Sequence, residues 1–140
     1  MDLIVKLPKS QGNDSILTIT NHDCTKVVIL IPCNEEMNSE QLAEIYKEKA
    51  FPYMGILSKI ISDRDVRLTS HFSKELCRQL DIQQNISTAY HPQTDGQSEK
   101  TNQHIEMALR IFTNYQQDDW AKWLPIVQYL SPASRVESHD

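Results

Sequence analysis

The order in which two kinds of hydrophobic pattern follow each other is the feature that most constrains the fold of this chain. Segments with a strand-like period of two, or with β-branched apolar runs, come first. Helical spacings of three and four then alternate with short apolar runs, which gives the order strand, strand, strand, helix, strand, helix, strand, helix. This order predicts an α/β fold with a mixed sheet flanked by helices, in which functional sites form at strand ends.

The first three predicted strands form a meander. Residues 15–20 alternate with a period near two, and residues 26–31 are β-branched and apolar. The turn-like residues 21–23 between them predict a hairpin. Another turn signal at residues 11–14 places the first strand at residues 2–7.

Strand and helix signals alternate in the rest of the chain. A helix capped by Ser39 is expected to end near Pro52, and with the strand at 59–62 it predicts a right-handed parallel crossover. A helix at 70–80 and a strand at 82–87 follow. Thr94 and Gln97 fit a capping box for the strongest helix, whose apolar stripe includes Ile105 and Leu109. Four apolar residues of a last helical segment are expected in the core or partly in a dimer contact: Trp120, Trp123, Leu124 and Ile126.

Length and composition limit the class of protein. With 140 residues, of which 39% are hydrophobic, the chain fits one globular domain with its own core. No apolar stretch approaches the roughly 20 residues of a spanning helix, so no membrane partner is expected. The N-terminus shows no secretory pattern, which favours an intracellular protein. Cys24, Cys33 and Cys77 form no Cys-x-x-Cys pair, which argues against structural zinc or a disulfide framework.

The net charge of −5 argues at first against a nucleic-acid partner. Basic and acidic residues are balanced between residues 59 and 110, however, so the acidic excess lies elsewhere. If some acids hold metal cations, the working surface is also less acidic than the formal charge indicates.

Three carboxylates stand where a metal site could form. Asp63 follows the apolar run at 60–62, Glu99 stands in the first turn of a predicted helix, and 35 residues separate them. Asp2 stands in the apolar run at 2–5. Oxygen ligands of this kind suit hard divalent cations and phosphoryl-transfer chemistry. Asp65 is a second candidate beside Asp63, but Asp63 directly follows the apolar strand, so Asp65 is interpreted as a solvated loop acid.

Three motifs resemble the integrase catalytic core of gypsy-type long-terminal-repeat retrotransposons, within the retroviral integrase superfamily. They are Asp2-Leu-Ile-Val-Lys-Leu-Pro, Ile61-Ser-Asp-Arg-Asp-Val-Arg and Ser87-Thr-Ala-Tyr-His-Pro-Gln-Thr-Asp-Gly-Gln-Ser-Glu-Lys-Thr-Asn. The last one is the most specific, and the likeness covers roughly residues 1–129. It implies a ribonuclease H-like fold and a catalytic triad of Asp2, Asp63 and Glu99 that also binds the metals. The 35-residue interval fits this family, whereas Asp65 would leave 33 residues.

The resemblance implies a metal-dependent polynucleotidyl transferase that processes the 3′ ends of element DNA and transfers them into target DNA. Its cofactors would be two Mg²⁺ or Mn²⁺ ions about 3.5–4 Å apart, which activate the attacking oxygen and stabilise the leaving one. The expected partners are nucleic acid (element DNA ends, target DNA and also RNA) and a second copy in a homodimer. The implied location is the nucleus, otherwise the cytoplasm.

Four further residues are predicted to contact nucleic acid. Tyr90 and Gln93 lie in the segment 90–96, which resembles a mobile loop beside the family's active site; an ordinary helix-entry loop is the alternative. Asn102, one turn after Glu99, matches a family position near the substrate, and Lys100 is assigned to phosphate. For both of these residues a solvated helix face is the alternative.

Departures from the family pattern keep other functions open. The first strand would begin at its own catalytic acid, so residues 1–129 are interpreted as an N-terminally clipped core and residues 130–140 as a divergent tail. A truncated element could be catalytically silent, or a domesticated nucleic-acid-binding protein. A nuclease with the same acids is a weaker alternative, because it would not need the segment from Tyr90 to Glu99.

Overall fold

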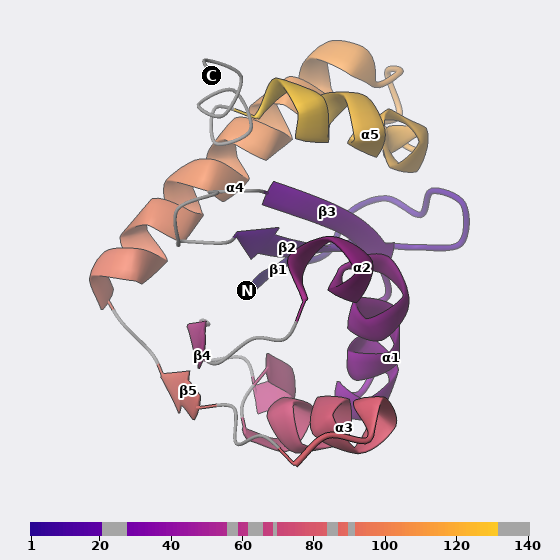
Figure 1. Ribbon diagram of the computed structural model, residues 1–140. Helices are drawn as coiled ribbons and strands as arrows, with labels where there is room; N and C mark the ends of the chain where they lie inside the picture. The colour runs from indigo at the N-terminus through magenta and orange to yellow at the C-terminus, as the bar shows by residue number, and fades with distance from the viewer. Residues whose placement is uncertain are drawn as a thin grey trace. The chain divides into compact units, whose positions relative to one another are not determined.

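The computed structural model describes residues 1–20, 28–55, 59–61, 66–68, 70–83, 87–89 and 92–131; at 59–61, 66, 87–89 and 92–98 it describes the backbone alone. The chain divides into two compact units. The first consists of Met1–Asp2 and Glu36–Gly96, and the second of Leu3–Glu35 and Gln97–Asp140. Figure 1 labels the helices and strands of both units. Among the described residues no helix is long and apolar enough to cross a membrane.

The second unit is built on a β-hairpin. Strand β2 (Ser15–Thr20) pairs antiparallel with β3 (Val28–Cys33), so that Ser15 lies opposite Cys33 and Thr20 opposite Val28. The β2 strand has the predicted bounds, whereas β3 begins and ends two residues later than expected. The β-branched and aliphatic residues of both strands are almost all buried, as suits a sheet without a solvated face. The predicted turn at 21–23 lies outside the described residues.

Strand β1 (Asp2–Ile4) completes a sheet of order β1-β2-β3, which confirms the predicted meander. The strand is shorter than expected because Lys6 adopts φ +61°, which ends the extended conformation. The next turn has positive φ at both central residues, Gln11 (+52°) and Gly12 (+80°). Two backbone hydrogen bonds of 2.9 and 3.0 Å between Ser10 and Asn13 close it. This confirms the predicted turn and identifies it as the primed type that hairpins favour.

Helices α4 (Pro92–Phe112) and α5 (Trp120–Leu130) contribute apolar side chains to the core of the second unit. The predicted stripe on α4 is confirmed, since Ile105 and Leu109 are buried while Ala108 and Phe112 pack against the same core. On α5, Trp120 and Leu124 are buried and Trp123 stacks on Phe112 with ring centroids 5.5 Å apart. The fully buried members of this core are Ile4, Ile16, Val28, Leu30, Ile105, Leu109, Trp120, Ala121, Leu124 and Val127.

Long-range hydrogen bonds attach α5 to the sheet and to the loop after β1. The indole Nε1 of Trp120 donates to the carbonyl of Pro8 at 2.6 Å, and the backbone N–H of Ala121 donates to Ser10 Oγ at 3.0 Å. The backbone N–H of Leu30 donates to Gln128 Oε1 at 2.9 Å. In the sheet order, β3 is an edge strand, so Gln128 satisfies a donor that an edge would otherwise leave open.

In the first unit, α1 (Ser39–Lys49) has a capping box. The side chain of Asn38 accepts from the Gln41 backbone N–H at 2.9 Å, and the Gln41 side chain accepts from the Asn38 N–H at 3.0 Å. The predicted cap at Ser39 is therefore wrong by one residue; Ser39 lies in the helix, and its hydroxyl donates to the Arg67 carbonyl. A short helix, α2 (Phe51–Met54), follows and contains Pro52 in its first turn, where proline is tolerated.

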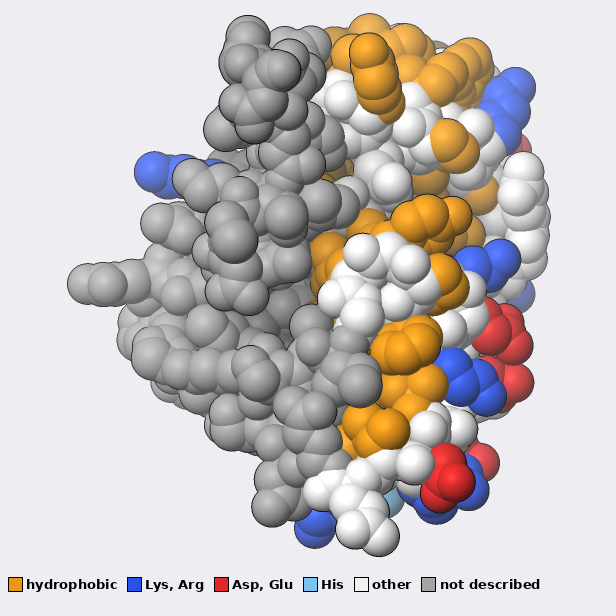
Figure 2. All heavy atoms as spheres, viewed as in Figure 1, with side chains coloured by type: hydrophobic (Ala, Val, Ile, Leu, Met, Phe, Trp, Pro, Cys, Tyr) orange, Lys and Arg blue, Asp and Glu red, His pale blue; other side chains and the backbone are white. Residues whose placement is uncertain are grey.

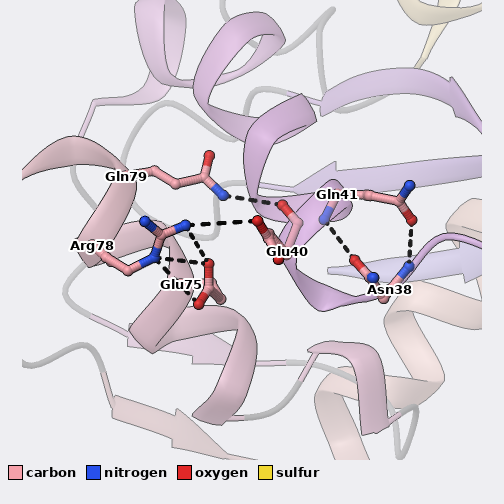
Figure 3. A network of polar contacts seen from close by, with 6 residues as sticks. All are labelled: Asn38, Glu40, Gln41, Glu75, Arg78 and Gln79. Atoms are coloured by element: carbon pink, nitrogen blue, oxygen red, sulfur yellow. Dashed lines mark hydrogen bonds and ion pairs between the residues drawn. The ribbon is translucent and has the colours of Figure 1, made fainter.

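Helix α3 (Ser70–Leu80) has the predicted bounds and packs beside α1 (Figure 1). Phe72 and Leu76 are buried, as the helical spacing predicts. Arg78 on α3 contacts Glu75 at 3.0 Å and Glu40 on α1 at 3.7 Å, and Gln79 Nε2 donates to the Glu40 carbonyl (Figure 3). Because Arg78 is 62% exposed, water screens these charges, and buried apolar contacts must contribute most of the α1–α3 stability.

Strands β4 (Lys59–Ile61) and β5 (Ser87–Ala89) form a parallel pair in which Ile60 lies opposite Thr88. The predicted strand at 59–62 is thus confirmed over 59–61, and residue 62 lies outside the described residues, but the strand expected at 82–87 begins at Ser87. β4 and β5 pair in parallel, and the segment that connects them contains a 3₁₀ turn (Val66–Leu68) and α3. The parallel crossover was predicted through α1 to β4, but among the described strands β4 does not pair with β3, and the parallel partner of β4 is β5.

The buried hydroxyl of Tyr46 is expected to make the stability of the protein depend on pH in the alkaline range. Tyr46 is fully buried on α1, its hydroxyl donates to the Gly55 carbonyl at 3.2 Å, and burial raises its pKa to about 12. In the unfolded chain this phenol ionises near pH 10. The contribution of Tyr46 is thus fully present below pH 10 and is lost as the pH rises towards 12.

The measurement is the urea midpoint between pH 9 and pH 11, compared with that of Tyr46→Phe. The wild-type midpoint should fall more steeply above pH 10 than that of the variant, because only the wild type has this phenol. Parallel curves for the two proteins would show that Tyr46 ionises as easily in the folded state as in the unfolded one.

Candidate functional site

Asp2 is the first of the three predicted metal ligands, and the structure places it at the start of β1. The residue is 7% exposed. Within the described part of the chain it makes no side-chain hydrogen bond and no ion pair. A buried carboxylate without a counter-charge is costly, and a bound cation would remove that cost. The sequence predicted a ligand here but gave no sign of its burial.

Glu99 lies on α4 in the second unit, with its side chain exposed to solvent. The following residue, Lys100, is exposed as well. Asn102 lies one helical turn after Glu99 on the same face, because residues three apart are neighbours on a helix. Its Oδ1 atom is buried and has no hydrogen-bond partner. Two of the predicted site residues, Glu99 and Asn102, are therefore brought together, and one of them holds an unused acceptor.

The start of α4 differs from the sequence prediction. The helix begins at Pro92 rather than after a cap at Thr94, so Gln93, Thr94 and Gly96 have helical backbone. The predicted loop at 90–96 is accordingly wrong from Pro92 onwards. Proline is well suited to the first turn of a helix, because its missing N–H would be unpaired there in any case. Glu99 is for the same reason two turns into the helix, and not in its first turn.

The remaining predicted site residues lie outside the described part of the structure. Strand β4 ends at Ile61, two residues before Asp63, and residues 62–65, which include Asp63 and Asp65, are not described. Tyr90 is also outside the described residues, and for Gln93 only the backbone is described. In the predicted tail, Leu130 still belongs to α5, and residues 132–140 are not described.

Two of the three predicted metal ligands, Asp2 and Glu99, are described in the structure. Asp2 and Glu99 supply carboxylate oxygens, which Mg²⁺ and Mn²⁺ prefer. Asp2 is buried without a counter-charge, and Glu99 is open to solvent. Among the described residues there is no cluster of three His, Cys, Asp or Glu side chains, so any triad depends on Asp63. Asp2 belongs to the first unit and Glu99 to the second, and Asp63 lies outside the described residues.

Two acids with lowered pKa values have structural roles instead. Asp14 Oδ1 accepts from the Glu35 backbone N–H at 2.8 Å, and this hydrogen bond lowers the pKa of the carboxyl. Asp119 Oδ1 accepts from the Asn114 N–H at 2.9 Å between α4 and α5, with the same effect on its pKa. Both carboxylates are fixed by backbone donors of loops, which is typical of turn stabilisation rather than catalysis.

Comparison with known proteins identifies relatives of this chain. It is 33% identical over 128 residues to the transposon Tf2-3 and Tf2-4 polyproteins of Schizosaccharomyces pombe. The match covers 91% of this chain but only 10% of each polyprotein, so the chain spans about a tenth of the length of these relatives. No family model matches the chain.

A chain from the cryo-EM structure of the simian T-cell lymphotropic virus intasome in complex with PP2A regulatory subunit B56 gamma has a similar fold. The TM-score is 0.61 at 16% sequence identity, over 91% of this chain and 46% of that one. The likeness is consistent with a ribonuclease H-like α/β fold. The chain is thus homologous to a segment of Tf2 retrotransposon polyproteins and shares the fold of a retroviral intasome chain, which together support an integrase-like region.

Proposed function

We propose that this chain is the catalytic core of a metal-dependent DNA integrase, of the gypsy type, which joins the ends of element DNA to target DNA. The observation that carries the proposal is the Asp2 carboxylate, which is 7% exposed and has no counter-charge among the described residues. A stable fold tolerates such a group poorly unless it is neutralised or binds a cation. The homology to transposon polyproteins supports integration as the reaction that uses the cation.

Asp2, Asp63 and Glu99 would hold two Mg²⁺ or Mn²⁺ ions. When bound, such ions supply an activated attacking oxygen and charge stabilisation at the leaving oxygen of a phosphodiester. The role of the protein is to supply the negative charge of the three carboxylates and to orient the DNA. The chemistry needs no protein base in this scheme, so no histidine is assigned to it.

Asn102 and Lys100 are proposed to contact the DNA next to Glu99. The buried Oδ1 of Asn102 lacks a partner, and its amide can also donate to a base edge or to a phosphate oxygen. Lys100 is exposed and can neutralise phosphate. The sequence motif also supports DNA contacts by Tyr90 and Gln93. Tyr90 would stack on an unpaired base.

A homodimer is proposed on a weaker observation. Hydrophobic side chains are exposed at the top of Figure 2. On α5, Ile126 is 42% and Tyr129 79% exposed. Ile126, expected in the core, is therefore on the surface. An exposed apolar helix face is typical of a surface that a partner covers. Action on chromosomal DNA would place the protein in the nucleus.

The test is a strand-transfer and disintegration assay on branched DNA substrates, with Mg²⁺, Mn²⁺, Ca²⁺ or EDTA. Joined products are expected with Mg²⁺ or Mn²⁺ and none with EDTA. Circular dichroism on the same samples establishes that the chain is folded in each condition. A folded chain that binds the DNA in a gel shift but forms no product with any metal would support the silent nucleic-acid-binding alternative. Cleavage without joining would support the nuclease.

A further inference from the structure

The second unit contains a cavity of about 240 Å³ that the proposed catalytic site does not use. It lies between the segment after β1, the last turns of α4 and the beginning of α5. Its floor is apolar and includes Leu109 and Trp120, which are 5% and 2% exposed. The hydrogen bond from Trp120 Nε1 to the Pro8 carbonyl joins two sides of the cavity. The walls of the cavity are therefore fixed by the core and by a partly buried hydrogen bond.

Three charged side chains line this cavity. Lys6 and Arg110 are both exposed, and Glu106 is partly buried. Among the described residues, none of the three makes an ion pair or a side-chain hydrogen bond. Two cations against one carboxylate leave a net charge of +1 at neutral pH. The dipole of α4 opposes this positive charge, because the carboxyl end of a helix carries about half a negative charge. That charge is smaller than the charge of the two cations.

Polar groups and unusual backbone geometry also gather at the cavity. Thr113 lines it, and the buried Thr113 hydroxyl has no hydrogen-bond partner. Lys6 and Gln117, which also line it, have φ values of +61° and +59°. Residues other than glycine rarely adopt a positive φ, and such backbone conformations are concentrated at functional sites. An unused hydroxyl and two residues in the left-handed region thus meet at one cavity.

We propose that this cavity binds a small organic anion whose apolar ring lies on Leu109 and Trp120 and whose charged group lies between Lys6 and Arg110. The volume is somewhat below that of common small-molecule pockets, which suits a ligand of one or two rings. The cations favour a carboxylate, sulfonate or phosphate, and Thr113 can donate a further hydrogen bond to it. Glu106 repels the anion and therefore limits its affinity.

The test uses naphthalene-2-sulfonate as the probe and the full chain without DNA or metal, by titration calorimetry. Tryptophan fluorescence, to which Trp120 and Trp123 both contribute, gives a second signal. Lys6→Gln and Arg110→Gln should each weaken binding about two- to fivefold, in the range of exposed ion pairs, and Glu106→Gln should strengthen it by a similar factor. Lys49→Gln on α1 is the matched control for loss of a positive charge and should leave the dissociation constant unchanged.

The opposite effects of these variants make the test specific. The neutral analogue 2-naphthalenemethanol should bind more weakly than the sulfonate to the wild type, and it should respond little to the charge substitutions. Equal affinity for the two probes would overturn the proposal, as would weaker binding after Glu106→Gln or unchanged binding after Lys6→Gln and Arg110→Gln. Absence of binding to the folded wild type would overturn it as well. Since no DNA is present, none of these results depends on integrase activity.

Discussion

Replacement of Asp63 by asparagine is expected to lower the rate of metal-dependent strand transfer on the order of 1,000-fold or more. The amide has nearly the shape of the carboxylate but no negative charge, so it cannot supply the charge that a divalent cation needs. Asp63 follows β4 (Lys59–Ile61), and it is the acid at the family's spacing from Glu99. The measurement is a single-turnover rate on branched DNA at saturating Mg²⁺ or Mn²⁺.

Asp65→Asn is the matched control, because it makes the same chemical change two residues further along. It should keep nearly the wild-type rate, whereas Glu99→Gln should resemble Asp63→Asn. Activity in Asp63→Asn together with inactivity in Asp65→Asn would move the ligand to Asp65. If all three variants kept the wild-type rate, the hypothesis of a carboxylate metal site would have to be abandoned.

Trp120→Ala is expected to lower the free energy of unfolding by about 3 to 5 kcal/mol. Trp120 is 2% exposed within the core of the second unit, and its indole donates to the Pro8 carbonyl at 2.6 Å. The substitution would leave a large cavity and an unpaired carbonyl. A domain of this size has only about 5 to 15 kcal/mol of stability, so the variant should be close to unfolding. Urea denaturation followed by circular dichroism measures the loss.

Two further variants separate the causes of this effect. Trp120→Phe keeps much of the ring volume but removes the indole N–H, so its cost should be nearer to about 1 to 3 kcal/mol. Trp123→Phe changes a partly buried ring that stacks on Phe112, and its cost should be smaller than that of Trp120→Ala. A loss below about 1 kcal/mol for Trp120→Ala would show that the core assignment is wrong.

Local patterns predicted the elements whose side chains follow one period throughout. Residues 15–20 alternate between the two faces of a strand, and residues 70–80 place Phe72 and Leu76 on one helix face, so β2 and α3 have their predicted bounds. Errors arose where two local signals compete. The segment 90–96 was predicted as a loop although Pro92 suits a helix start, and the cap was assigned to Ser39 although Asn38 can also cap a helix.

The predicted site depends on the sequence more than on the described structure. The motifs around Asp2, Asp63 and Glu99 point to the same integrase-like region as the homology to transposon polyproteins. Their spacing along the chain could be interpreted without a model, because it is a property of the order of residues. Two other features could not be predicted from the sequence: among the described residues Asp2 has no counter-charge, and the Asn102 Oδ1 has no donor. Both features depend on what packs around a side chain.

The sequence by itself determined the alternation of strands and helices, the turn at Gln11 and Gly12, and the order of the three acids. These follow from residue type and spacing over a few neighbours. Only the tertiary structure decided which donors and charges find partners. Trp120 bonds to Pro8 across 112 positions and Leu30 to Gln128 across 98. Such pairs form because burial of distant apolar faces brings them together. Within the described residues, the packing of the second unit leaves Lys6 and Arg110 without ion pairs at the cavity.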